Sequence, residues 1–232
     1  MFSYYGSKSK VVDYYPKPKH GKIIEPFAGS ARYSLKYFEN DVLLIDEYEI
    51  IVRIWKYLQG CSVNDIMSLP KLKQGETINR DDFDCIEQAW LMGFLITNGV
   101  ATPMLTMSKW GEVVFEKQRS DIAQQLYKIK HWKIQQGKHT DLINEKATWF
   151  IDPPYQVGGH KYKHNNKKID YTELASWCRT RKGQIIVCEN TNADWMSFKP
   201  MRKQNGIVYR TTEAIWSNHK TNYDAVQQSL QL

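Results

Sequence analysis

Asp152, Pro153, Pro154 and Tyr155 form a tetrapeptide whose residue types could do chemistry. It directly follows the apolar run 147–151, which is typical of a buried strand. The two prolines remove two amide donors and fix the chain, so a rigid turn is one use for such a sequence. Ligands of α/β proteins, however, bind at the carboxyl ends of the strands. We therefore interpret the tetrapeptide as catalytic.

The Asp152 carboxylate, the Pro153 carbonyl and the Tyr155 ring suit an amino group on a planar base such as adenine. The lone pair of this amine is delocalised into the base, which makes the nitrogen a poor nucleophile. Two acceptors that take its two hydrogens would draw the nitrogen towards tetrahedral geometry and aim the lone pair at a sulfonium methyl. Tyr155 would stack on a base flipped out of a duplex. This chemistry needs no covalent nucleophile and no metal.

A turn of small residues and a later acidic residue predict a site for an adenosine-containing cofactor. Residues 26–31 lie between a strand-like run and a helical pattern, where backbone amides can approach a ligand. Asp46 ends the next apolar run, and its carboxylate can accept hydrogen bonds from both ribose hydroxyls. A GxGxxG pattern is absent, which disfavours a dinucleotide. The candidate contacts in these two segments are Glu25, Pro26, Phe27, Ala28, Gly29, Ser30, Asp46 and Glu47.

Apolar runs that alternate with helical patterns predict an α/β fold with a mostly parallel sheet. The strand-like runs are 22–27, 42–46, 132–134, 147–151 and 184–188, and late runs at 206–210 and 213–216 predict an antiparallel edge hairpin. Helical spacing occurs at 31–38, 51–58, 83–94, 122–129 and 174–178, with a polar stretch at 98–120. We expect a catalytic domain of residues 1–60 and 132–232. Residues 61–131 would be a small helical insertion that recognises the target.

The order of these motifs resembles the Dam-like family of DNA adenine methyltransferases, particularly its short phage and prophage forms. The N-terminal run Tyr4-Tyr5-Gly6-Ser7-Lys8 is similar to the family's cofactor motif, and the resemblance covers most of the chain. It implies a Rossmann-like methyltransferase fold, S-adenosylmethionine as cofactor and methylation of adenine N6 in double-stranded DNA. The S-adenosylmethionine contacts that it implies are Tyr4, Tyr5, Gly6, Lys8, Asp46 and Asp152.

Three features of the sequence depart from the family pattern. Ser30-Ala31 stands where the family usually has a further glycine, and Tyr4 stands where a tryptophan is frequent. Between the second predicted strand and Asp152, where the family places target recognition, no segment matches. Both substitutions keep small or aromatic character, so the expected cofactor is unchanged.

Basic and aromatic residues after the tetrapeptide predict contacts with DNA. Lys161, Tyr162 and Lys163 follow the pair Gly158-Gly159 and predict a basic lid beside the flipped base, with a solvated charge run as the alternative. Lys109 and Arg119 in the polar stretch are further candidates for contacts with bases or phosphates. Trp216 and Asn218 resemble the family's late hairpin beside the target base, although a packed edge hairpin is an equal alternative.

Composition and charge favour a cytoplasmic protein with a polyanionic partner. The 232 residues carry a net charge of +7 with a pI near 9.1, and 42% are hydrophobic. A signal peptide, a membrane span and CxxC spacing among the four cysteines are absent, so we expect neither a membrane association nor a structural zinc. His160 and His164 lack companions at metal-ligand spacing, so no metal is expected there.

Three alternative functions remain open at this point. An RNA adenine methyltransferase, or one that acts on another planar amine or amide, would need the same tetrapeptide. A catalytically inactive nucleic-acid-binding module could keep the fold. A dinucleotide-dependent oxidoreductase is the third alternative, because an acid after the second strand also occurs in that class.

Overall fold

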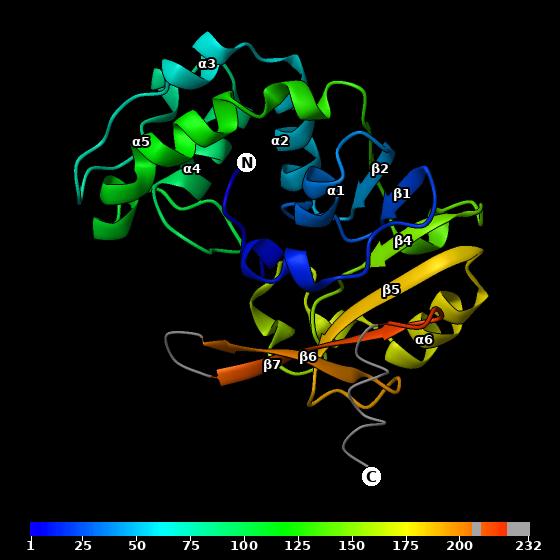
Figure 1. Cartoon of the computed structure of the whole chain (residues 1–232). Helices are drawn as coiled ribbons and strands as arrows, with labels where there is room; N and C mark the ends of the chain where they lie inside the picture. The colour runs from blue at the N-terminus through cyan, green and yellow to red at the C-terminus, as the bar shows by residue number, and fades with distance from the viewer. Residues whose placement is uncertain (206–209, 222–232) are drawn as a thin grey trace.

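A seven-stranded sheet forms the centre of the computed structural model, which describes residues 1–205 and 210–221 (Figure 1). The strand order is β3-β2-β1-β4-β5-β7-β6. In chain order the strands are β1 (Lys22–Glu25), β2 (Asp41–Asp46), β3 (Lys133–Gln136), β4 (Ala147–Ile151), β5 (Gly183–Asn190), β6 (Lys199–Asn205) and β7 (Arg210–Ser217).

Strand direction confirms the predicted α/β fold with a mostly parallel sheet. β3, β2, β1, β4 and β5 pair in parallel, while β7 is antiparallel to both β5 and β6. The edge hairpin therefore exists, but its first strand is β6 and not the run 206–210. Of that run, 206–209 lie outside the described residues and Arg210 begins β7.

Helices cover both faces of the sheet because neighbouring strand residues point to opposite faces. Ile23 packs in one cluster with α2 and α4, whereas Ile24 packs in the other with α6. The helices are α1 (Arg32–Lys36), α2 (Glu49–Gly60), α3 (Val63–Met67), α4 (Ile86–Leu95), α5 (Lys109–Ala123) and α6 (Tyr171–Thr180). Asp170 caps the amino end of α6, since its side chain accepts hydrogen bonds from the amides of Thr172 and Glu173.

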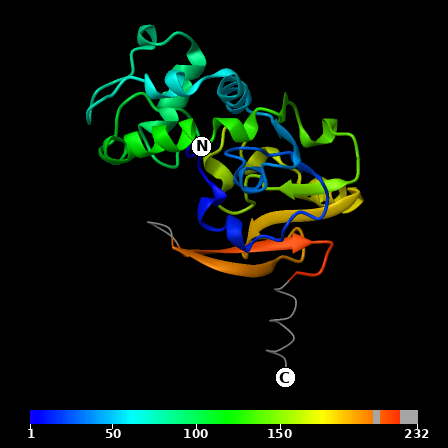
Figure 2. The same cartoon turned by 45° about the horizontal axis from the view of Figure 1, so that its top comes forward.

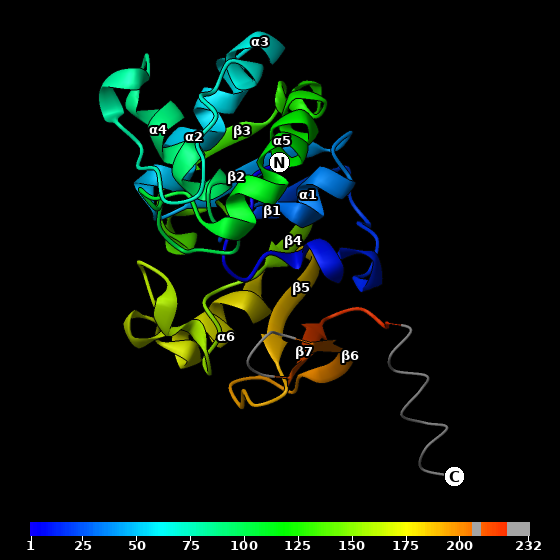
Figure 3. The ribbon, with the colours of Figure 1, turned by 90° about the vertical axis from the view of Figure 1, so that its left-hand side faces the viewer.

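Helices α3, α4 and α5 lie at one end of the molecule and β6 and β7 at the other (Figures 2 and 3). Helix α5 was not expected, because it begins inside the polar stretch 98–120. Its buried face consists of Gly111, Phe115, Arg119, Ile122 and Ala123, so a glycine and an arginine replace apolar residues in the stripe that periodicity detects. The helical spacing at 122–129 instead marks the end of α5 and a separate 3-10 turn at Leu126–Ile129.

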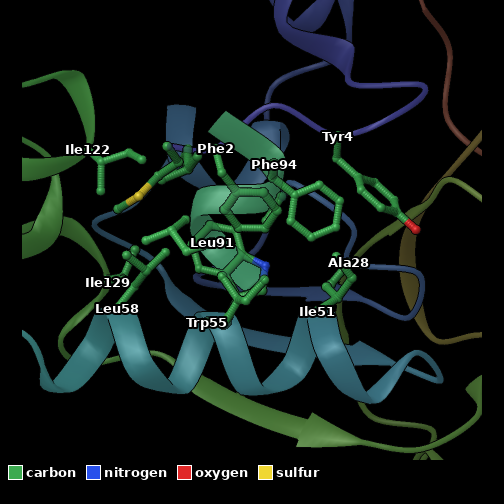
Figure 4. Close-up of a cluster of buried hydrophobic side chains, with 14 of the residues drawn as sticks. Phe2, Tyr4, Ala28, Ile51, Trp55, Leu58, Leu91, Phe94, Ile122 and Ile129 are labelled. Atoms are coloured by element: carbon green, nitrogen blue, oxygen red, sulfur yellow. The ribbon is translucent and has the colours of Figure 1, made fainter. Parts of the chain in front are cut away.

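The N-terminal segment is anchored in the core between α2 and α4. Phe2 is fully buried, and its ring centroid lies 5.3 Å from that of Trp55 and 5.6 Å from that of Phe94 (Figure 4). Tyr4 also packs on Phe94, with 5.7 Å between centroids. These contacts hold the following residues against the sheet. Among the described residues, every helix is too short or too polar to cross a membrane.

Candidate functional site

A cavity of about 460 Å³ opens where β1, β2 and β4 end at their carboxyl termini. It gathers segments that lie far apart in the sequence: the N-terminal run, the turn after β1, the end of β2, the tetrapeptide and the loop after it. Fifteen of the residues that we predicted to bind a cofactor, to take part in catalysis or to contact DNA line this cavity. They are Tyr4, Tyr5, Gly6, Lys8, Glu25, Pro26, Phe27, Ala28, Gly29, Ser30, Asp46, Glu47, Asp152, Pro154 and Tyr162.

The turn after β1 is shaped by residues with positive φ. Gly29 has φ of 46°, and a Cβ placed there would lie 3.1 Å from Cδ1 of Tyr4. Helix α2 holds the turn, because the indole nitrogen of Trp55 donates a hydrogen bond of 2.9 Å to the Gly29 carbonyl. Ala31 also lies in the left-handed region, with φ of 44° and ψ of 44°. Only glycine adopts this region without strain, which agrees with the expectation of a further glycine at Ser30-Ala31.

Glu25 is buried beneath this turn and contacts helix α1. Its Oε1 accepts a 2.7 Å hydrogen bond from the Ser34 amide in the first turn of the helix. Burial raises the pKa of Glu25 to about 8, although the Ser34 hydrogen bond opposes the shift. The structure therefore shows a capping role for this carboxyl, which still lines the cavity.

Asp46 lies where β2 ends, and backbone amides hold both of its carboxylate oxygens. Oδ2 accepts from the Gly29 amide at 2.9 Å, and Oδ1 accepts from the Tyr48 amide at 2.8 Å. Burial raises the pKa of Asp46, while these two hydrogen bonds oppose the increase. A carboxylate has about four acceptor positions, so both oxygens keep capacity for a further donor. The neighbouring Glu47 is more exposed, with one oxygen 3.4 Å from Nδ1 of His164.

A buried ion pair joins the N-terminal run to the tetrapeptide. Nζ of Lys8 lies 2.8 Å from Oδ1 of Asp152 and 3.8 Å from Oε1 of Glu213. Burial raises the pKa of Asp152 to about 6; the Lys8 ammonium opposes this increase and the Glu213 carboxylate adds to it. Burial alone would lower the pKa of Lys8, but Asp152 and Glu213 outweigh it and the pKa is raised. Lys8 is therefore charged at neutral pH, with Asp152 mostly ionised.

The rest of the tetrapeptide is fixed by neighbouring side chains. The Pro154 carbonyl accepts a 2.6 Å hydrogen bond from the Tyr171 hydroxyl, and the Tyr155 hydroxyl donates to Glu213. Nζ of Lys8 lies 4.5 Å from the Tyr155 ring centroid. Pro153 is buried, and no donor among the described residues reaches its carbonyl. Neither Pro153 nor Tyr155 belongs to the residues that line the cavity.

The predicted basic lid has two different faces. Lys161 and Lys163 are exposed, whereas Tyr162 and His164 line the cavity. The Tyr162 hydroxyl donates a 3.1 Å hydrogen bond to the Tyr5 carbonyl, and a Cβ on Gly6 would lie 2.0 Å from that hydroxyl. Tyr162 thus closes a wall of the cavity in this structure, and its contact with DNA stays a prediction.

Arg119 does not present its guanidinium to a nucleic acid. The residue is 5% exposed, and its guanidinium donates to the carbonyls of Met67 and Leu69 and to the Glu116 carboxylate. The structure therefore contradicts the predicted DNA contact, because the cation joins α5 to the end of α3. Lys109, by contrast, is exposed at the start of α5.

Trp216 and Asn218 lie away from the cavity of about 460 Å³. Because β7 is antiparallel to β5, its last residues lie beside the amino end of β5. Asn218 accepts from the Ile185 amide and donates to the Gly183 carbonyl. Trp216 lines a second, smaller pocket of about 170 Å³. Of the two alternatives for these residues, the structure supports the packed edge hairpin, and of the late hairpin it is Glu213 that reaches Lys8.

Sequence reasoning missed Tyr15, Tyr48, His139 and Trp177. His139, just after β3, stacks on Phe27 with 5.3 Å between centroids and packs edge-on against Trp177. Tyr48, His139 and Trp177 line the cavity. These residues belong to no motif, and only the sheet order could have placed them at this edge. Among the described residues, no group of three or more His, Cys, Asp or Glu side chains could hold a metal ion.

Comparisons with known proteins give fold-level similarity only. The chain matches no protein-family model and no curated protein. The Escherichia coli protein yhhF, provisionally described as a methyltransferase, shares 9% identity with a TM-score of 0.37 over 90% of this chain and 78% of its own. The Haemophilus influenzae protein HI0767, provisionally described as a methylase, shares 8% identity with a TM-score of 0.36 over 86% of this chain and 80% of its own. Both similarities are too low to indicate a shared substrate.

Proposed function

We propose that this protein transfers a methyl group from S-adenosylmethionine to the exocyclic N6 amino group of adenine in DNA. The observation that carries this proposal is the position of Asp152. Its carboxylate follows β4 and lines the same cavity as Asp46 and the Gly29 turn. An acceptor for an amino group and an acceptor for ribose hydroxyls thus share one pocket at the edge where ligands of such sheets bind.

The charges of the cavity fit S-adenosylmethionine better than a dinucleotide. Six carboxyl groups line it, against four lysine or arginine side chains: Glu25, Asp46, Glu47, Asp152, Asp170 and Glu173, against Lys8, Arg32, Lys138 and Lys168. Because burial raises the pKa of Glu25 to about 8, that carboxyl is mostly neutral, and the other five leave a slight acidic excess that suits a sulfonium and an ammonium better than a pyrophosphate. Asp46 would hold the ribose, with the Gly29 turn beside the methionine part. The bound cofactor supplies an electrophilic methyl group.

The tetrapeptide's role is to hold and polarise the amine. Asp152 accepts one amino hydrogen when ionised, and the Pro153 carbonyl is the acceptor proposed for the other. Together they favour a nitrogen whose lone pair faces the methyl group. The ion pair with Lys8 keeps the Asp152 carboxylate ionised although burial raises its pKa. Tyr155 provides the ring on which the flipped base stacks.

A DNA partner is supported by where the positive charge lies. Residues 61–131 contain eight lysines and arginines against nine acidic residues, so the net positive charge belongs to the remainder of the chain. Lys161, Lys163 and Lys167 are exposed on the loop that walls the cavity. Phosphates held there would place a flipped base at the cavity mouth. We therefore propose this loop, more than the helical insertion, as the main phosphate contact.

Transfer of a radiolabelled methyl group from S-adenosylmethionine to duplex DNA tests the proposal. We expect the wild-type chain to label DNA, Asp152→Ala to abolish labelling, and Asp41→Ala to retain it, because Asp41 lies at the amino end of β2. Circular dichroism checks that both variants fold.

The alternatives give different outcomes in the same experiment. Labelling of RNA but not DNA would favour an RNA methyltransferase. DNA binding without any transfer would indicate a non-catalytic module of this fold. Calorimetric binding of NAD, with no binding of S-adenosylmethionine, would indicate an oxidoreductase.

A further inference from the structure

Glu213 lies at the transfer site although it comes late in the chain. Strand β7 runs antiparallel to β5, so Glu213 pairs with Asn190 at the carboxyl end of β5. The residue is 3% exposed. A buried carboxylate is costly unless hydrogen bonds and opposite charge compensate for it, so its surroundings indicate what it holds.

One oxygen of Glu213 contacts three different segments. Oε1 accepts hydrogen bonds from the hydroxyls of Tyr15 and Tyr155, and it lies 3.8 Å from Nζ of Lys8. The hydroxyl lies at the far end of the tyrosine ring, so a hydrogen bond to it holds that end of the ring in place. The same Lys8 ammonium is paired with Asp152 at 2.8 Å.

We propose that Glu213 is a positioning residue of the transfer site, which fixes the Tyr155 ring and shares the Lys8 ammonium with Asp152. This inference rests on the function proposed above. A base can stack only on a ring that stays in place, and the hydroxyl bond opposes displacement of the far end of the Tyr155 ring. Because both carboxylates share the Lys8 ammonium, the charge of Glu213 on the edge hairpin affects the ionisation of Asp152.

The charge of Glu213 has a consequence that can be measured at Asp152. Burial and the Glu213 carboxylate raise the pKa of Asp152, and Lys8 lowers it. Other titratable groups also surround this centre and stay in place when Glu213 is changed: Tyr15, Glu25, Tyr155, Tyr162 and Cys188. Removal of the Glu213 charge leaves Lys8 paired with Asp152 alone, which stabilises the ionised form.

Carbon-13 NMR of aspartate carboxyls, with Asp152→Asn for assignment, tests this coupling without cofactor or DNA. We expect the Asp152 titration midpoint to fall from about 6 towards the ordinary value of 3.8 in Glu213→Gln. Tyr15→Phe is the matched control, because it removes a hydrogen bond to the same oxygen and leaves both charges in place. An unchanged midpoint in Glu213→Gln would overturn the proposal.

Steady-state kinetics tests the role of the hydrogen bond between the Tyr155 hydroxyl and Glu213. Tyr155→Phe keeps the ring and removes its bond to Glu213, so we expect kcat to fall roughly tenfold, since a hydrogen bond to a charged group contributes on that order. The dissociation constant of S-adenosylhomocysteine, measured by calorimetry, should not change. A kcat for Tyr155→Phe equal to that of the wild-type chain would contradict this role of the hydrogen bond. If the wild-type chain transfers no methyl group to DNA, the proposed function fails, whereas the NMR titration still decides whether Glu213 is coupled to Asp152.

Discussion

At the scale of single residues, the position of a side chain was predictable where it directly follows or ends an apolar run. Asp152 and Asp46 follow apolar runs, so their place at the strand ends could be inferred from the sequence. The contacts of Glu213 with Tyr155 and with Tyr15 could not be inferred, because they span 58 and 198 positions. Such contacts depend on strand order, which apolar periodicity does not report.

Ala31 carries a backbone conformation that an alanine disfavours. A left-handed conformation costs roughly 1–2 kcal/mol for a residue with a Cβ, while glycine adds about 0.4–1 kcal/mol of unfolded-state entropy. We therefore expect Ala31→Gly to raise the free energy of unfolding by up to about 1 kcal/mol, measured by urea denaturation. Gly29→Ala should instead lower the free energy of unfolding, because it puts a Cβ against Tyr4 at a residue with positive φ. Stabilisation by Gly29→Ala would contradict this account of the turn.

The pH dependence of transfer follows from Asp152. The pKa of this carboxyl is raised to about 6, so the group is ionised above that pH and protonated below it. A protonated carboxyl loses acceptor capacity and its charge pairing with Lys8. We expect single-turnover rates to fall as pH decreases through about 6, with the unfolding midpoint monitored at each pH. If the rate instead falls only near the ordinary pKa of an aspartate, Asp152 is less buried during the reaction than in this structure.

At the scale of elements, the strands were predicted better than the helices and loops that connect them. The parallel strands are continuous apolar runs, which periodicity detects. Helix α5 was missed because its buried stripe includes Gly111 and Arg119, and the two alternatives for Trp216 stayed open because the sequence does not give the direction of β7. The loop after the tetrapeptide was expected to be basic, but its alternation of exposed lysines with inward Tyr162 and His164 is visible only in the structure.

Exposed lysines of this loop should dominate the salt dependence of DNA binding. Each phosphate contact contributes about 0.9 to the slope of log K against log salt. Substitution of Lys161, Lys163 and Lys167 by glutamine should reduce the slope by about 2 to 3, measured by fluorescence anisotropy. The matched control replaces Lys71, Lys73 and Lys117, of which Lys71 pairs with Glu116 and Lys117 with Asp121. An equal loss in the control would place the DNA on the helical insertion.

At the scale of the whole molecule, the fold class agrees with the prediction from the sequence, and most residues predicted to hold a cofactor line one cavity together with Asp152. Hydrophobic packing accounts for this agreement, because the burial of Phe2 and Trp55 draws the N-terminal run onto the sheet beside Asp152. The polymer that carries the target amine is not encoded in such local patterns. A tetrapeptide that polarises an amino group acts in the same way on any planar base, so the acceptor has to be identified by its product.

Nucleoside analysis of the methylated product tests the central claim most directly. Unmethylated duplex DNA is incubated with S-adenosylmethionine and either the wild-type chain or Asp152→Ala, digested to nucleosides and analysed by mass spectrometry. We predict N6-methyldeoxyadenosine in the wild-type sample and none with Asp152→Ala. A methyl group on another nucleoside, or equal amounts of N6-methyldeoxyadenosine with both proteins, would contradict the proposed chemistry.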